Sequence, residues 1–467
     1  MSESPETEVL HTEILVVGWG KAGKTLAGAL GRAGRSVTLV ERSADMVGGT
    51  CINIGCVPTK ALVHSAQGRR EEDEASAYFR AAVDRRDSLI DRLNEANRAM
   101  LEPVDQVRLV VGGTAEFTGP RRVRVTGGPE PEELEITADS VIINTGAVPR
   151  RLDVPGADGP RVHDSTTIQH VDPFPERLAI VGAGPVALEF ASVFARFGSE
   201  VTLLERGERI LRREDEDVAA SVRQALEDEG VRVLTGAEPT AIEDDGDSMT
   251  VRTGAGDVTA DAVLVAVGRV PATAGLGLDA AGIEVGERGE VVVDDLLRAR
   301  VDGSWAEGVW AVGDVNGGPQ QTYVSYDDYR IVLSQLDGSG GRSRADRVAV
   351  PTTVFMTPPL GRVGLSETEA LEAGRRIEVY AKEVAKIAVM PRPKTLGETH
   401  GLVKVVVDAD TDLVLGAALH TVDAQELVNL VALAMRTGTT RRQLLDGIWT
   451  HPSTTEALNE VLALPRG

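Results

Sequence analysis

A pattern of strand, glycine-rich turn, helix and strand occurs twice, and it constrains the fold of this chain more than any other feature. The first copy runs from the apolar segment 14–17 through G-W-G-K-A-G and a small-residue helix to an apolar segment that ends at Glu41. The second copy runs from residues 178–181 through G-A-G-P-V-A to Glu205. In both copies the acid follows the first glycine of the turn by 23 positions. We therefore expect two dinucleotide-binding units in one chain.

The first turn has the glycine spacing that a bound pyrophosphate requires. Gly18 permits a tight turn, Gly20 lets the backbone approach the phosphates, and Gly23 lets the helix lie close to its strand. The phosphates then meet free N–H groups at the start of the helix. Glu41, at the end of the next strand, can accept hydrogen bonds from a ribose. Because strand, helix and acid are all in place, this unit predicts a dinucleotide site.

The second turn carries Gly182 and Gly184, with Ala187 in place of the third glycine. Alanine at this position is commoner in proteins that bind NADP. Glu205, however, would repel a 2′-phosphate and favours NADH. Two arginines that follow it could offset this repulsion. We give the carboxylate more weight and predict NADH, with NADPH as the alternative.

The only two cysteines, Cys51 and Cys56, lie in G-G-T-C-I-N-I-G-C-V-P-T-K. Residues five apart point in different directions on a regular helix, so a disulfide between them requires a distorted turn. Gly55 and Pro58 provide unusual backbone freedom and restraint at this point. A thiolate near a helix N-terminus has a lowered pKa, which suits thiol–disulfide exchange. Two thiolates without a nearby histidine make a poor zinc site, so we predict a redox pair and no metal site.

Composition excludes several classes of partner. The formal net charge of −23 repels phosphate backbones and anionic lipids, and 3% aromatic residues argue against a base-stacking surface. The acidic start M-S-E-S-P-E-T-E differs from a secretory signal, which is basic and then apolar. No apolar run approaches the ~18 residues that a membrane span needs. We expect a cytoplasmic protein that binds neither nucleic acid nor membrane.

Together these motifs resemble the pyridine nucleotide–disulfide oxidoreductases, the family of dihydrolipoamide dehydrogenase, glutathione reductase and mercuric reductase. The resemblance runs from about residue 12 to the end of the chain. It implies an α/β fold with two Rossmann-like domains, for FAD and NAD(P), and a C-terminal α+β dimerisation domain. The implied ranges are 1–150 and 273–348 for FAD, 151–272 for NAD(P) and 349–467 for dimerisation.

The resemblance also implies roles for single residues. Cys56 would face the flavin as the charge-transfer thiol, and Cys51 would exchange with the substrate. Lys60 would lie near flavin N5, with Glu189 beside it at the nicotinamide, and Asp314 would bind the ribityl chain. The other cofactor-binding positions that it implies are Gly49, Thr50, Ala115, Thr145, Gly146, Gly268 and Thr322.

The C-terminal stretch T-H-P-S-T-T-E-A-L at 450–458 resembles the family's acid/base dyad. His451 would transfer protons and Glu456 would orient it. A carboxylate that holds one ring nitrogen fixes the tautomer and raises the basicity of the other. In the family this dyad reaches the cysteines of the second subunit. The resemblance therefore implies a homodimer whose interface is built by residues after about 350.

Four short segments point to one subgroup of the family. They are C-I-N-I-G-C, T-K-A-L-V-H at 59–64, Q-Q-T-Y-V-S-Y-D-D-Y-R at 320–330 and F-M-T-P-P-L-G-R-V-G at 355–364. The last two differ from dihydrolipoamide dehydrogenases, and the chain lacks the extra C-terminal cysteine pair of mercuric reductases and large thioredoxin reductases. They resemble the reactive-chlorine-resistance flavoproteins, bacterial cupric reductases that protect against hypochlorous acid.

The resulting prediction is an oxidoreductase that passes electrons from NADH through FAD and the Cys51–Cys56 disulfide to an acceptor such as Cu(II). Two alternatives stay open: a dihydrolipoamide dehydrogenase, and a non-catalytic flavin redox sensor.

Overall fold

The computed structural model of the chain describes residues 8–128 and 133–465, which form two compact units. The first unit comprises the chain up to Ala61, Val83–Arg150 and Arg269–Asp346. The second comprises Leu62–Ala82, Arg151–Gly268 and the chain from Arg347 onward. Residues 1–7, on which the predicted absence of a secretory signal mainly depends, lie outside the described residues. The assignment of four ranges to cofactor and dimerisation domains stays a prediction.

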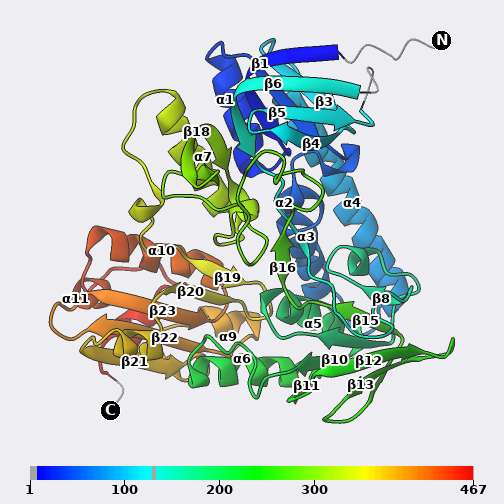
Figure 1. Cartoon of the computed structure of the whole chain (residues 1–467). Coiled ribbons are helices and arrows are strands. Elements are labelled where there is room, and N and C mark those ends of the chain that lie inside the picture. Colours follow the sequence, from blue (N-terminus) through cyan, green and yellow to red (C-terminus); the bar gives the residue numbers. More distant parts are fainter. Residues whose placement is uncertain (1–7, 129–132, 466–467) are drawn as a thin grey trace. The chain divides into compact units, whose positions relative to one another are not determined.

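The first unit is built on a sheet with the strand order β17–β18–β6–β1–β2–β3 (Figure 1). Strands β18, β6, β1, β2 and β3 run parallel, and the antiparallel pair β4–β5 extends from β6. The strands span Glu8–Val17 (β1), Val37–Glu41 (β2), Val107–Val111 (β3), Thr114–Gly119 (β4), Arg122–Thr126 (β5), Glu133–Ile143 (β6), Arg298–Val301 (β17) and Ser304–Ala311 (β18).

Strand β1 is apolar without alternation because both of its faces are covered. Ile14 and Val16 pack in a cluster with Leu26 of the helix α1 (Lys21–Arg32). Leu15 and Val17 point to the other face and pack in a cluster with side chains of β4 and β5. Such coverage on both faces is typical of parallel sheets with crossover helices. It explains why the predicted segment 14–17 reads as a continuous hydrophobic run.

The cysteines lie at a break between two helices of the chain. Helix α2 (Thr50–Asn53) contains Cys51, and helix α3 (Cys56–Gln67) begins at the second cysteine. Between them the Gly55 N–H donates a 2.7 Å hydrogen bond to the Thr50 carbonyl. The predicted distortion is thus a joint between two helices. The long helix α4 (Ala75–Ala99) follows.

The second unit contains a parallel sheet with the order β11–β10–β9–β15–β8, in which α5 (Pro185–Phe197) connects β9 to β10. An antiparallel sheet of β12, β13 and β14 accompanies it. The strands span Val162–His163 (β8), Arg177–Val181 (β9), Glu200–Glu205 (β10), Arg232–Thr235 (β11), Pro239–Asp244 (β12), Met249–Thr253 (β13), Val258–Ala260 (β14) and Ala262–Val265 (β15). The chain thus repeats the strand–turn–helix–strand pattern of the first unit.

The rest of the second unit is an antiparallel sheet in the order β19–β20–β23–β22–β21, packed against helix α10 (Ala424–Thr437). The strands span Thr352–Val354 (β19), Leu360–Gly364 (β20), Ile377–Glu383 (β21), Leu402–Asp408 (β22) and Val414–His420 (β23). Apolar residues of β22, β23 and α10 form its core.

One charged residue of β22, Lys404, is buried with three carboxylates. Its Nζ lies 3.1 Å from Asp215, 2.9 Å from Asp217 and 2.7 Å from Glu367. Burial raises the pKa of the Asp215 carboxyl, but hydrogen bonds from the N–H groups of Glu367 and Thr368 and from the lysine outweigh it and hold the pKa at about 2. This cluster ties helix α6 (Glu216–Asp228) to the antiparallel sheet.

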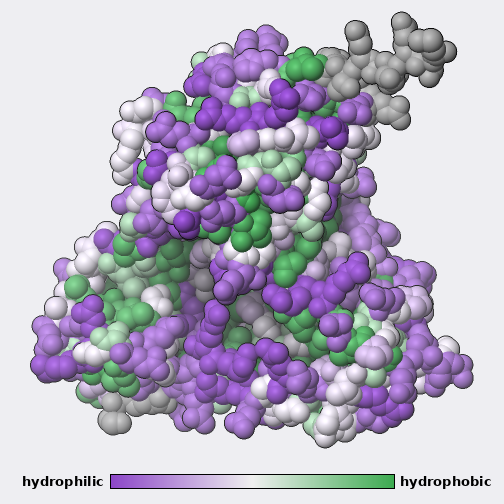
Figure 2. Space-filling view, viewed as in Figure 1, coloured by the Kyte–Doolittle hydropathy of each residue, from purple (hydrophilic) through white to green (hydrophobic). Residues whose placement is uncertain are grey.

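The face shown in Figure 2 is largely hydrophilic, and hydrophobic side chains gather over the region that carries α10. From residue 347 onward, seven large apolar residues are exposed in the described part of the chain: Val348, Leu371, Val389, Leu396, Leu433, Ile448 and Leu464. Among the described residues, no helix is both long and apolar enough to cross a bilayer.

Candidate active site

The two predicted redox cysteines lie together in the first unit as free thiols. They share a hydrogen bond, and the Thr322 hydroxyl lies 3.3 Å from the Cys56 sulphur. Thr322 is the first residue of helix α7 (Thr322–Leu336), so a segment 266 residues away in the sequence supplies this contact. Thr322, predicted from the family as a cofactor-binding residue, thus contacts the thiol directly.

The two thiols have opposite acidities. The hydrogen bond from Cys51, the bond from Thr322 and the charge of Lys60 lower the pKa of Cys56 to about 6, although burial opposes them. The same shared hydrogen bond and burial raise the pKa of Cys51. Cys56 is therefore the thiolate of the reduced pair at neutral pH, and Cys51 is its proton-bearing partner. A pair with one stable thiolate suits thiol–disulfide exchange.

The first glycine turn has the shape that FAD needs. Gly18 has φ +102°, and a Cβ there would lie 2.4 Å from the Asn144 carbonyl oxygen. Gly20 caps α1 in an extended conformation and has no side chain to occupy the start of the helix, where a phosphate could be received. The Glu41 carboxylate accepts bonds from the N–H groups of Trp19 (2.9 Å) and Ser43 (3.1 Å) at the end of β2. Burial raises the pKa of Glu41, and a ribose hydroxyl is a suitable further donor for it.

Asn144 holds this turn in place, although it is not among the site residues predicted from the sequence. Its Oδ1 accepts a 2.9 Å hydrogen bond from the Gly23 N–H, and its Nδ2 donates a 2.9 Å bond to the Val312 carbonyl. A Cβ at Gly20 or Gly23 would lie within 2.7 Å of its side-chain oxygen. The asparagine therefore joins β6 and β18 to the start of α1. Its one sequence signal is a polar residue that ends the buried run V-I-I-N.

Asp314, the predicted ribityl ligand, follows β18 in the short turn Gly313–Asn316. Burial raises the pKa of its carboxyl, and no residue in the described part of the chain donates a hydrogen bond to its side chain. A half-buried carboxylate without such a donor fits a polyol ligand. The glycine turn, Glu41 and Asp314 together therefore fit FAD.

The structure also places the other residues that the family resemblance predicts for FAD. Thr145 and Gly146 (φ +76°) follow β6, and the Thr145 hydroxyl donates a 2.9 Å bond to the Ala272 carbonyl. Gly49 (φ +81°) caps the helix that starts at Thr50, and a Cβ on it would lie 2.8 Å from Gly20 Cα. Two predicted residues remain. Lys60 lies in α3, and Ala115 lies in β4 and is buried in the core of the first unit.

The second glycine turn repeats the first in detail. Gly182 has φ +108°, and a Cβ there would lie 2.6 Å from the Ala266 carbonyl, as Gly18 does with Asn144. Gly184 caps α5, and Glu205 ends β10 and accepts a 2.7 Å bond from the N–H two residues later. Gly268 (φ +113°) follows β15 as Gly146 follows β6. This equivalence supports a second dinucleotide site.

Glu189, predicted at the nicotinamide, lies buried in α5 and accepts a 2.9 Å hydrogen bond from the Phe355 N–H. The N–H of Thr357 likewise bonds to Ser192 of the same helix at 3.3 Å. Helix α5 is thereby attached to the segment before β20. The role of Glu189 at the nicotinamide stays a prediction.

The predicted dyad is formed in the second unit. His451 Nδ1 lies 2.8 Å from Glu456 Oε1, and the Ser453 N–H donates a 2.8 Å bond to the other carboxylate oxygen. These bonds lower the pKa of Glu456, although burial opposes them. The carboxylate is largely buried and the imidazole is 69% exposed. The glutamate therefore fixes one ring nitrogen and leaves Nε2 open for proton transfer.

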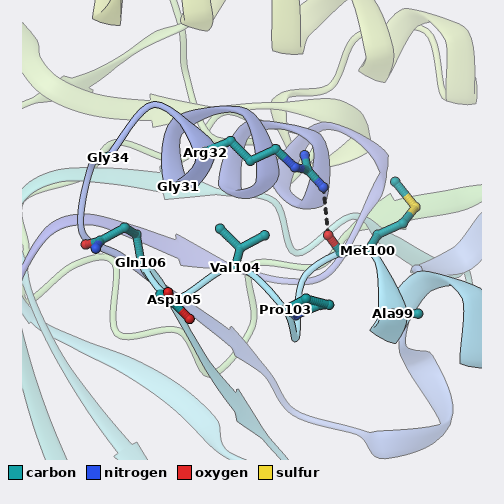
Figure 3. A pocket seen from close by; sticks show the side chains of 9 residues that line it. All are labelled: Gly31, Arg32, Gly34, Ala99, Met100, Pro103, Val104, Asp105 and Gln106. Carbon is teal, nitrogen blue, oxygen red and sulfur yellow. Dashed lines mark hydrogen bonds between the residues drawn. The ribbon is translucent and has the colours of Figure 1, made fainter.

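A shallow hollow at the far end of α1 is distinct from these sites (Figure 3). Gly31, Arg32 and Pro103 are among its lining residues, and Arg32 donates a 2.8 Å bond to the Met100 carbonyl. It lies at the helix C-terminus, and in parallel sheets ligands bind at the carboxyl ends of the strands, where the helices begin. This hollow therefore has no part in the dinucleotide chemistry.

Comparison with known proteins agrees with this geometry. Residues 12–328 match the family described as pyridine nucleotide-disulphide oxidoreductase, and residues 350–462 match its dimerisation domain. The second match supports a homodimer. The chain is 42% identical to the probable pyridine nucleotide-disulfide oxidoreductase RclA of Escherichia coli, over 97% of this chain and 99% of that protein. It is 36% identical to a dihydrolipoyl dehydrogenase of Thermus scotoductus, over 96% of each.

A solved structure of the Escherichia coli protein is similarly close. The Cu(II) complex of the HOCl-induced flavoprotein disulfide reductase RclA superposes with a TM-score of 0.90 at 42% identity, over 97% of this chain and all of that one. The predicted fold class and the predicted resemblance to this subgroup are thus confirmed. The chain belongs to the pyridine nucleotide-disulphide oxidoreductases, enzymes that use FAD and a pyridine nucleotide.

Proposed function

We propose that this enzyme uses NADH to reduce Cu(II) through FAD and the Cys51–Cys56 pair, as part of a cytoplasmic defence against hypochlorous acid and related oxidants. The observation that carries the proposal is the hydrogen-bonded thiol pair, in which Cys56 has a pKa of about 6. The 42% identical relative, a flavoprotein disulfide reductase induced by HOCl and solved with Cu(II), supports the choice of acceptor.

The proposed reaction balances with NADH as the electron donor and Cu(II) as the electron acceptor. Bound FAD would supply the two-electron relay between the nicotinamide and the sulphur pair. Two electrons and one proton from NADH break the sulphur–sulphur bond, so that Cys56 becomes a thiolate and Cys51 keeps the proton. Two Cu(II) ions then take one electron each, the sulphur–sulphur bond re-forms, and the proton is released. Thiolates are soft ligands that favour the Cu(I) product.

The preference for NADH is proposed from the end of β10. The Glu205 carboxylate is held there by the Gly207 N–H, in the position where it can accept both ribose hydroxyls. The guanidinium of Arg209 is held within its own loop, where it donates to the Arg212 and Glu214 carbonyls. A 2′-phosphate would therefore meet a fixed negative charge.

The dyad is proposed to act at the thiols of a second subunit. His451 lies three residues after Ile448, which is fully exposed in the single chain. Exposed apolar residues near a catalytic group indicate a surface that another chain covers. His451 would accept the Cys51 proton when that thiol reacts, and Glu456 would stabilise the imidazolium that forms.

The test is NADH-dependent Cu(II) reduction by the purified flavoprotein, followed with a Cu(I)-specific chelator. Cys56→Ser should abolish most of the turnover, and Cys51→Ser serves as the matched variant because it removes the other sulphur. FAD content, read from the flavin absorbance, should stay unchanged in both. Wild-type turnover in Cys56→Ser would contradict the thiol route.

Dihydrolipoamide oxidation is the second candidate, because the chain is 36% identical to a dihydrolipoyl dehydrogenase and forms the same type of dyad. An assay with dihydrolipoamide and NAD⁺ separates the two. Robust turnover in that assay, with slow Cu(II) reduction, would favour the second candidate. Stopped-flow mixing with NADH also tests for a sensor, in which the flavin would stay oxidised for minutes.

A further inference from the structure

Lys24, on the second turn of α1, is a buried lysine that the proposed chemistry has not used. Its side chain is 9% exposed, and its Nζ donates to the Asn97 side-chain oxygen (2.5 Å) and to the Gly48 carbonyl (3.3 Å). Both acceptors are neutral. Among the described residues, the printed contacts of this ammonium group are these two neutral oxygens, and the charges that act on it are those of Lys21 and Cys51.

A buried charge without a counter-ion is costly, because the interior solvates it poorly. Burial lowers the pKa of Lys24 to about 8; the nearby charge of Lys21 acts in the same direction, and Cys51 opposes it. The Asn97 amide offers only a dipole, since its own Nδ2 donates to the Leu93 carbonyl. The site therefore favours an anion that arrives during the reaction.

The segment that Lys24 contacts leads directly to the reactive sulphurs. Its acceptor Gly48 precedes Gly49, which packs so closely on the first glycine turn that a Cβ there would lie 2.8 Å from Gly20 Cα. Helix α2 starts at the next residue, and Cys51 is its second residue. The cation is thus fixed beside the segment that carries Cys51, and its charge lowers the pKa of that thiol, against the larger raising effects of the shared hydrogen bond and burial.

We propose that Lys24 is the buried counter-cation of the Cys51–Cys56 pair, a positioning charge that stabilises its reduced, anionic form. This inference rests on the proposed function, in which two electrons and one proton convert the neutral disulfide into one thiol and one thiolate. The ammonium group attracts the product of that step and not the disulfide. It therefore makes the pair easier to reduce by NADH.

The expected effect of the Lys24 charge is that of one charge–charge interaction in a partly desolvated site. Such an interaction changes the equilibrium constant for reduction of the disulfide about tenfold. For a two-electron couple, tenfold corresponds to about 30 mV. Lys24→Met should shift the equilibrium toward the disulfide by this factor. Asn97→Asp should shift it in the same direction, because it keeps the lysine and adds a carboxylate within contact of it.

The experiment equilibrates each FAD-loaded enzyme with glutathione redox buffers, quenches it with acid, alkylates the free thiols and counts them by mass spectrometry. Lys21→Met is the matched control, since it removes one positive charge from the same helix at a residue that lies 4.7 Å from the Tyr326 ring. It should shift the equilibrium much less. The difference between wild type and Lys24→Met should shrink as the pH rises above about 8, where Lys24 loses its proton.

Three results would contradict the inference in distinguishable ways. If the wild-type thiols never form a disulfide, the proposed function fails together with the role of Lys24. If they do, and neither Lys24→Met nor Asn97→Asp changes the equilibrium, only the role of Lys24 fails. If Lys24→Met loses FAD while its disulfide equilibrium is unchanged, the anion that Lys24 serves is the dinucleotide pyrophosphate at the start of α1, and the inference is wrong.

Discussion

The contact between Thr322 and Cys56 leads to a quantitative prediction for Thr322→Val. Valine has nearly the same shape as threonine but has no hydroxyl, so the variant removes the donor that lies 3.3 Å from the sulphur. Hydrogen bonds to charged groups contribute about 1.5–3 kcal/mol. The Cys56 residue is exposed in the single chain, so we take the lower value. At about 1.4 kcal/mol per pKa unit, the pKa of Cys56 should rise by about one unit, to about 7.

The measurement is a pH titration of thiolate absorbance in the reduced enzyme. Cys56 titrates first, because the shared hydrogen bond and burial raise the pKa of Cys51. In the wild type about nine-tenths of Cys56 should be thiolate near pH 7, and in Thr322→Val about half. Thr322→Ser keeps the hydroxyl and should titrate like the wild type. A first titration step at the wild-type pH in Thr322→Val would refute the assignment of this hydroxyl as a thiolate donor.

Three further predictions concern other parts of the molecule. Glu456→Gln should lower turnover about 100-fold without changing the unfolding midpoint, because the neutral amide no longer stabilises a protonated His451; steady-state kinetics across pH check this. Glu205→Ser should raise the kcat/KM ratio of NADPH to NADH about tenfold, since the charge that meets the 2′-phosphate is gone; an unchanged ratio would show that the discrimination lies elsewhere. Lys404→Met should lower the free energy of unfolding by about 3–5 kcal/mol in denaturant titrations, because it removes the cation that three partly buried carboxylates share. In the wild type the depressed pKa of Asp215, about 2, stabilises the fold above about pH 4, and that contribution should be lost as the pH falls from about 4 through 2.

Features that depend on local backbone chemistry could be predicted from the sequence. Gly18 and Gly182 take left-handed conformations that other residues rarely adopt, and both acids lie at the ends of the predicted strands. Helix α1 begins at Lys21, directly after the second glycine of the predicted turn, because Gly20 itself forms the cap. Signals of this kind lie within a few residues of the structure that they determine.

Contacts between distant segments could not be predicted in this way. Asn144 bonds to Gly23 over 121 positions, and Thr322 reaches Cys56 over 266. Lys404, in β22, contacts the Asp217 carboxylate because this strand lies beside the start of α6. Each of these residues is a polar residue whose own segment does not show which distant residue it will contact. In the proposed function, the acceptor meets a surface that two subunits would form, and residue spacing does not describe that surface.

The joint at Gly55 has a mechanical consequence. The two sulphurs sit on separate short helices, and the loop that a bond between them closes is only a few residues long. In the chain-entropy view a closure of this size contributes about 2 kcal/mol to stability, against nearly 5 kcal/mol for a loop of 100 residues. The bond between the Gly55 N–H and the Thr50 carbonyl already holds the same segment. The enzyme can therefore open and remake a covalent link in each catalytic cycle while the rest of its architecture stays unaltered.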